Sequence, residues 1–84
     1  MTTNGKDIEK RIEESNVKGH CLMALKGDVV KTYKGRKYAK DTCFVVDHFE
    51  EWRDLYGRVQ TIYVVDQYNR RVDSYNCKII RHIG

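Results

Sequence analysis

The sequence predicts a mainly β fold, a five-stranded antiparallel barrel that follows one short α-helix. Three observations lead to this fold class. The chain has 84 residues, the size of one small domain. After residue 20, short runs of apolar, β-branched and aromatic residues alternate with turn residues. Between these runs the sequence predicts no long helix. We therefore divide the chain into a helical arm, residues 1–19, and a small barrel, residues 20–84.

The arm is predicted to be helical over residues 4–17. Ile8 and Ile12 are four positions apart and Val17 continues roughly the same face, while charged residues occupy most other positions. A helix of this length is only marginally stable alone, so we expect its apolar stripe to pack on the barrel. The alternative is a partly frayed arm.

The predicted strands are short and end at turn residues. Asn69 tolerates a positive φ, so residues 66–69 suit a hairpin turn. The segment 50–56 is ambiguous, and we favour a hairpin tip over a helix because Gly57 then opens the return strand. The predicted runs are 20–25, 29–33, 42–49 and 59–65, followed by 71–72 and 77–80 around a 3₁₀ turn at 73–76.

Four short motifs resemble segments of SH3-like small barrels, in particular KOW-like and phage-associated members. The motifs are KGDVV at 26–30, VKTYKGRKYAKDT at 30–42, YGRV at 56–59 and SYNCKII at 74–80. They follow the order in which those proteins use a Gly-Asp turn, a basic loop, a hairpin return and a final strand. Ala39 and Asp41 stand where the relatives usually have a proline and a second glycine. The resemblance covers residues 26–81 and implies an SH3-like barrel, a fold that binds RNA, DNA, ribosomes, peptides or methylated tails.

The charges of the chain lie in opposed blocks. The formal net charge is +4, yet residues 18–40 contain seven Lys and Arg against Asp28 alone, a net of +6. Residues 41–60 contain five carboxylates against Arg53 and Arg58, a net of −3. A basic stretch of this kind attracts nucleic-acid phosphates or an acidic protein surface, although it also suits a solvated face with nearby counter-charges.

The sequence favours a binding module over an enzyme. A chain this short rarely holds a deep pocket, and no GxSxG, P-loop or GxGxxG motif is present. Cys43 and His48 are five positions apart, as are Cys77 and His82, and this odd spacing places both members on opposite faces of a strand. We therefore expect no metal site and no cofactor.

Several remaining features bear on environment. The longest apolar runs are far shorter than a membrane span requires, and the first 15 residues lack the apolar core of a secretory signal. Three cysteines without a CxxC pair favour a reducing compartment. We expect a cytoplasmic protein, in the host cytoplasm if a phage encodes it, that does not bind membranes and is a monomer or weak dimer.

Our first hypothesis is binding of nucleic acid or a ribonucleoprotein. Cations and aromatic rings alternate in the stretch after residue 30, and single-strand binders use cations along the backbone and rings against the bases. The competing interpretation is that the tyrosines brace the fold while the cations keep it soluble. The predicted nucleic-acid-binding residues are Lys31, Lys34, Arg36, Lys37, Tyr38, Lys40, Arg70 and Arg71.

Our second hypothesis is a phage-type accessory protein that binds and modulates a host protein. Phe49, Trp52, Leu55 and Tyr56 place large apolar groups beside acidic residues, as an interface anchor would. Alternatively, Trp52 folds back over one end of the barrel and packs in the core.

Overall fold

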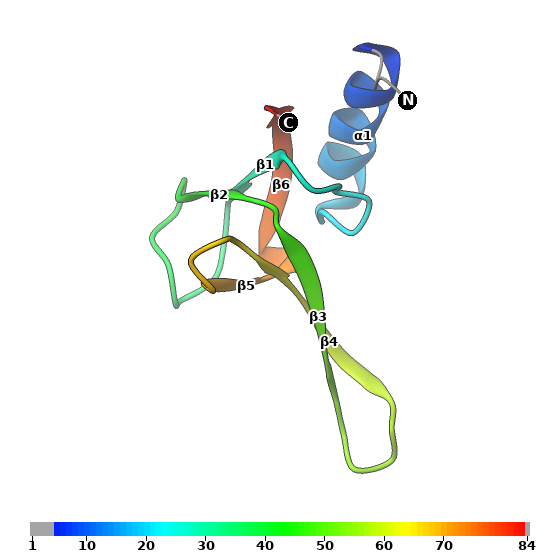
Figure 1. Cartoon of the computed structure of the whole chain (residues 1–84), viewed down its shortest axis with the longest axis vertical. Helices are drawn as coiled ribbons and strands as arrows, with labels where there is room; N and C mark the ends of the chain where they lie inside the picture. The colour runs from blue at the N-terminus through cyan, green and yellow to red at the C-terminus, as the bar shows by residue number, and fades with distance from the viewer. Residues whose placement is uncertain (1–4, 84) are drawn as a thin grey trace.

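The computed structural model describes residues 5–83 and shows one helix and six strands (Figure 1). These strands form two three-stranded antiparallel sheets, ordered β2-β1-β6 and β3-β4-β5. The elements are α1 (Gly5–Lys18), β1 (Asp28–Thr32), β2 (Cys43–Val45), β3 (His48–Arg53), β4 (Val59–Val65), β5 (Arg71–Asp73), the 3₁₀ turn η1 (Ser74–Asn76) and β6 (Cys77–His82). The prediction of a mainly β fold is confirmed, but the predicted five-stranded closed barrel is wrong.

The error arises in the predicted strand 42–49, which the structure divides between the two sheets. β2 pairs with β1, whereas β3 pairs with β4. At the crossing, the Val46 N–H donates to Asp28 in the first sheet and the Asp47 N–H donates to Val65 in the second, both at 2.9 Å. Because backbone partners change between two adjacent residues, one apolar run supplies two strands.

The predicted strand 20–25 is also absent, and the segment forms consecutive turns instead. The Ala24 N–H donates to Cys21 at 3.0 Å, and the Asp28 N–H donates to Leu25 at 2.9 Å. Cys21 and Ala24 are nevertheless buried in the core. The apolar composition of this segment therefore reflects its burial in the core and not pairing in a sheet.

The core lies between the two sheets and under the helix. Phe44, Val64 and Ile79 are almost completely buried and come from β2, β4 and β6. Ile12 of α1 and Phe49 of β3 pack against this cluster at its margins. Each element therefore contributes one face to a shared core, as expected for a domain built from packed layers.

The helix docks on β6 through a face that is only partly the predicted one. Ile8 and Ile12 are half-buried as expected, but Val17 is 80% exposed. Arg11 and Ser15 complete the inward face, at the helical spacing of three to four residues. The helix is therefore part of the fold and not a frayed arm, although its predicted start at residue 4 lies outside the described residues.

The β3–β4 hairpin extends well beyond the other elements (Figure 1). The molecule as a whole measures 41 × 28 × 27 Å. The interpretation of 50–56 as a hairpin tip is confirmed, since β3 continues to Arg53 and β4 begins at Val59. Asp54 organises the turn, because one carboxylate oxygen accepts the N–H groups of Tyr56 and Arg58.

The remaining turns follow the predicted chemistry. Asn69 has a φ of 64° in the turn between β4 and β5. Asp73 caps η1, where its side chain accepts the Tyr75 N–H.

Among residues 5–83, no helix is both long and apolar enough to span a membrane.

Candidate nucleic-acid interface

A cavity of about 260 Å³ lies between the loop that follows β1 and the edge formed by β5 and η1. We call it the basic cavity. Residues far apart in the sequence meet there, because β5 and η1 bring the end of the chain back to the loop. The basic cavity is lined by Thr32, Lys34, Gly35, Arg36, Lys37, Tyr38, Tyr63, Arg71, Val72, Asp73 and Asn76.

Backbone contacts hold the loop against η1. The Tyr33 N–H donates to the Asn76 carbonyl at 2.9 Å. Gly35 has a φ of 111°, and a Cβ at this position would lie 2.8 Å from the Asn76 side-chain nitrogen. Glycine therefore serves two needs here, an unusual backbone angle and a close approach. The cationic residues that follow, 36 and 37, are thereby placed at the rim.

Two tyrosines line the cavity. Tyr38 is half-buried, and its ring meets the Phe44 ring edge-to-face at a centroid distance of 4.9 Å. Tyr63, also half-buried, lies on β4 opposite Asp73 of β5. A ring held by the core on one side loses little further freedom on stacking with a ligand. Tyr38 thus combines the two predicted roles, bracing the fold and lining the candidate site.

Tyr33, by contrast, mainly braces the structure. Its hydroxyl hydrogen-bonds to the Gly19 carbonyl and lies 3.0 Å from the Tyr75 carbonyl. Lysine side chains approach its ring, with Lys34 Nζ at 5.4 Å and Lys78 Nζ at 4.6 Å from the centroid.

The cations of the basic cavity differ in how they are neutralised. Within residues 5–83, no carboxylate lies within ion-pair distance of Lys34, Arg36 or Lys37, all three of which are exposed. Arg71 instead donates to Glu50 on the neighbouring hairpin, at 3.0 and 2.9 Å. The three cations without an ion-pair partner outnumber Asp73, the one carboxylate in the lining, and a concave surface of this charge favours an anion.

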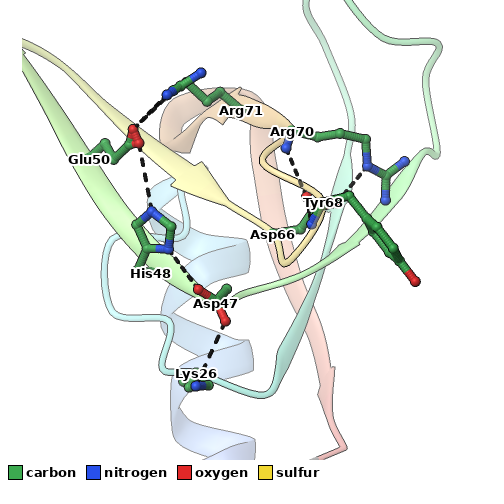
Figure 2. Close-up of polar contacts among 8 residues, drawn as sticks. All are labelled: Lys26, Asp47, His48, Glu50, Asp66, Tyr68, Arg70 and Arg71. Carbon is green, nitrogen blue, oxygen red and sulfur yellow. Dashed lines mark hydrogen bonds and ion pairs between the residues drawn. The ribbon is translucent and has the colours of Figure 1, made fainter.

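Arg71 belongs to a chain of polar contacts that continues through Glu50, His48 and Asp47 to Lys26 (Figure 2). Glu50 also lies 3.7 Å from His48, whose other ring nitrogen lies 2.7 Å from Asp47. Asp47 in turn lies 3.8 Å from Lys26. Arg71 holds the pKa of Glu50 below its usual value, and His48 does the same for Asp47. Both carboxylates therefore remain charged at neutral pH.

The structure does not bring all predicted residues into the basic cavity. Lys34, Arg36, Lys37, Tyr38 and Arg71 line it. The other predicted residues, Lys31, Lys40 and Arg70, are not part of its lining.

Two of these three have other partners. Lys31 lies 3.8 Å from Asp41. Arg70 donates to Asp66 (Figure 2), and its guanidinium carbon lies 4.7 Å from the Phe44 ring centroid. Asp66 is buried, which by itself raises the pKa of its carboxyl, but Arg70 and nearby N–H groups outweigh this effect and the net shift is downward. Arg70 therefore stabilises the turn between β4 and β5.

Sequence reasoning did not assign six of the lining residues to a site: Thr32, Gly35, Tyr63, Val72, Asp73 and Asn76. Tyr63 was part of a predicted core strand, and Asp73 and Asn76 were assigned to turn chemistry. The pairing of Tyr63 with Asp73 places both beside the loop. Only the register of β4 against β5 shows that Tyr63 and Asp73 lie beside the loop, and a single sequence does not specify that register.

The second predicted surface divides in the structure. Trp52 is 56% exposed, Tyr56 is 83% exposed and Leu55 is fully exposed, all on the projecting hairpin. Phe49 instead packs against the core at the base of β3. The idea that Trp52 folds back over the core is therefore wrong, and Phe49 takes that role.

Metal-ligating side chains do not converge in the part of the chain that the structure describes. No group of three or more His, Cys, Asp or Glu side chains there could hold a metal ion. Cys43 is exposed on β2, and His48 interacts with Asp47 and Glu50.

Comparison with known proteins finds no matching family, no similar curated protein and no similar solved structure. The resemblance of residues 26–81 to SH3-like proteins therefore stays a prediction. The fold and the site together define a small β domain with two sheets, one docked helix and a cavity lined by cations and tyrosines.

Proposed function

We propose that this protein is a non-enzymatic module that binds single-stranded nucleic acid, free or within a ribonucleoprotein, at the basic cavity. The observation that carries this proposal is the meeting of Lys34, Arg36, Lys37 and Arg71 around Tyr38 and Tyr63. The cations would neutralise successive phosphates, and the rings would stack on bases, at about 1–3 kcal/mol for each stacked base. The cavity is smaller than the roughly 300–1,000 Å³ of typical small-molecule sites, which suits one base of a longer strand.

The test is binding of fluorescent RNA and DNA oligonucleotides, measured by anisotropy over a range of salt concentrations. If Lys34, Arg36 and Lys37 each contact one phosphate, log affinity should fall with log salt at a slope of about −2. The variant Arg36→Glu/Lys37→Glu should lower affinity at least tenfold and make this slope shallower by about 1.4, since two contacts are lost.

The matched control is Lys10→Glu/Lys18→Glu, which makes the same change in net charge on exposed positions of α1. This control should retain most of the affinity. Equal losses in the two variants would show that binding follows net charge alone, and unchanged binding in the first variant would refute the proposal.

A second candidate function, binding to a host protein as a phage-type accessory protein, is supported by the projecting hairpin. This hairpin extends beyond the rest of the domain (Figure 1). Its residues Trp52, Leu55 and Tyr56 are exposed, and such apolar anchors dominate many interfaces. Pull-downs from lysate with and without nuclease separate the two functions, because a nucleic-acid-mediated partner is lost after nuclease treatment.

The hairpin hypothesis predicts that Trp52→Ala abolishes a nuclease-resistant complex while the thermal unfolding curve stays the same. Tyr68→Ala is the control, since Tyr68 is also a largely exposed aromatic residue but lies on a different turn. A complex that both variants lose, or that neither loses, would contradict the hairpin as the contact. For both candidates we propose a cytoplasmic site of action and a monomer or weak dimer.

A further inference from the structure

Two buried thiols lie in contact at the junction of the helix connection and the last strand. Cys21 and Cys77 are both fully buried, and their sulfur atoms are 2.9 Å apart. This is closer than their contacts with backbone oxygens, which are 3.4 Å from Cys21 to Ser74 and 3.6 Å from Cys77 to Asp73. Each sulfur is thus the nearest polar neighbour of the other.

The backbone holds both cysteines in place. The Cys21 N–H donates to the Ser74 carbonyl at 3.0 Å, which fixes the helix connection to η1. Cys77 begins β6 directly after η1 and pairs with Thr32 of β1. A disulfide bond would need the sulfurs to come about 0.9 Å closer than they lie in the reduced pair.

We propose that Cys21 and Cys77 form a native disulfide when the chain folds in the presence of an oxidised low-molecular-weight disulfide such as glutathione disulfide. In the first step, one cysteine thiolate attacks a sulfur of the oxidant, forming a mixed disulfide and releasing one glutathione thiol. In the second step, the other cysteine attacks the protein sulfur of that mixed disulfide and releases the second glutathione. Two protein thiols lose two electrons and two protons, and one glutathione disulfide becomes two thiols.

The burial of the thiols determines when this chemistry occurs. The neighbouring Cys77 thiol and burial together raise the pKa of Cys21 far above its ordinary value. Since the thiolate is the attacking species, the folded, reduced protein reacts slowly and the bond forms while the chain is folding. In a reducing cytoplasm the pair stays as thiols, so the bond marks a chain that folded in an oxidising environment.

The bond would close a long loop, because the two residues are 56 positions apart. Cross-links of long loops restrict the unfolded chain most strongly. The oxidised protein should therefore have a Tm at least about 10 °C above that of the reduced protein. It would also fix η1, whose Asn76 lines the basic cavity.

The test uses the full chain with Cys43→Ala, which removes the one exposed thiol among residues 5–83. The reduced, unfolded protein is refolded in mixtures of reduced and oxidised glutathione, quenched with acid, alkylated in denaturant and weighed intact. We expect a monomer with no alkylated cysteine, a linked peptide pair containing residues 21 and 77, and the higher Tm.

A second variant, Cys21→Ser/Cys43→Ala, leaves Cys77 alone and should become fully alkylated or carry one glutathione. If this variant does not fold, the Cys43→Ala protein alone decides the question. Two alkylated thiols at every glutathione ratio would overturn the proposal and leave only a thiol–thiol hydrogen bond. A cross-link that does not raise the Tm would also overturn it, because the native structure would then not accommodate the bond.

Discussion

At the scale of single residues, two buried serines show that hydrogen-bond partners determine how much a hydroxyl group contributes to the stability of the fold. Ser15 of α1 donates to the His20 carbonyl at 2.6 Å and accepts the Ile79 N–H of β6 at 2.8 Å. Ser74 of η1 is as deeply buried, but within residues 5–83 its hydroxyl has no hydrogen-bond partner. Burial without a partner costs free energy, whereas a doubly bonded hydroxyl stabilises the fold.

We therefore predict opposite effects for two identical substitutions. Ser15→Ala should lower the free energy of unfolding by about 1–3 kcal/mol, because it leaves the Ile79 N–H without its acceptor. Ser74→Ala should be neutral or raise the free energy of unfolding by up to about 1 kcal/mol. Urea denaturation measures both values, and a larger loss for Ser74→Ala than for Ser15→Ala would contradict this account.

At the scale of elements, two glycine turns differ in their surroundings. Gly35 and Gly57 both have a positive φ, of 111° and 80°. A Cβ on Gly57, at the tip of the hairpin, would meet nothing within 4 Å, whereas a Cβ on Gly35 would crowd Asn76. Only the turn at Gly57 is therefore limited by backbone conformation alone.

We predict that Gly57→Ala lowers the free energy of unfolding by about 1 kcal/mol, the cost of placing a side chain at positive φ. Gly35→Ala should cost more than this, since Asn76 must also move, and it should weaken oligonucleotide binding at the basic cavity. Denaturation curves and anisotropy for the two variants provide the measurements. Equal stability losses with equal binding would show that the approach of Gly35 to Asn76 is not important.

The elements were predictable to the extent that they depend on local chemistry. The hairpin at 50–56, the turn at Asn69 and a 3₁₀ turn at 73–76 were predicted from turn residues. The structure has all three, with the 3₁₀ turn at Ser74–Asn76 and Asp73 as its cap. The strand predicted at 20–25 was wrong because an apolar composition reports burial and not backbone pairing. The strand predicted at 42–49 was wrong because the change of partners at Val46 depends on β1 and β4.

At the scale of the whole molecule, one buried carboxylate joins three distant elements. Asp28 of β1 is fully buried and accepts hydrogen bonds from Arg11 of α1 at 3.0 and 3.2 Å. The His82 ring of β6 lies 2.7 Å away, and the Leu25 N–H also donates to this carboxylate. Burial by itself raises the pKa of Asp28, but these partners outweigh it and the net shift is downward.

A carboxyl whose pKa is lowered on folding stabilises the protein above its unfolded pKa and loses this contribution as pH falls through its folded pKa. We predict that Asp28→Asn lowers the free energy of unfolding by about 3 kcal/mol at neutral pH, since Arg11 keeps its burial and loses its partner. The difference from wild type should shrink as pH falls below about 4. Urea denaturation over this pH range tests both statements.

Asp41→Asn serves as the control, because Asp41 is exposed and its ion pair with Lys31 is long. Exposed pairs contribute at most about 1 kcal/mol, so this variant should follow wild type closely at each pH. Parallel curves for Asp28→Asn and wild type through the acid range would show that Asp28 does not contribute to the acid sensitivity.

The sequence by itself determined a small, mainly β domain with a docked helix, because periodicity and turn chemistry are local properties. It also identified the basic stretch that contains Lys34, Arg36 and Lys37. Only the tertiary structure decided that the strands form two sheets, that Arg71 joins this stretch while Arg70 does not, and that Cys21 meets Cys77. These features depend on which distant segments pair, and pairing is set by the packing of the whole chain.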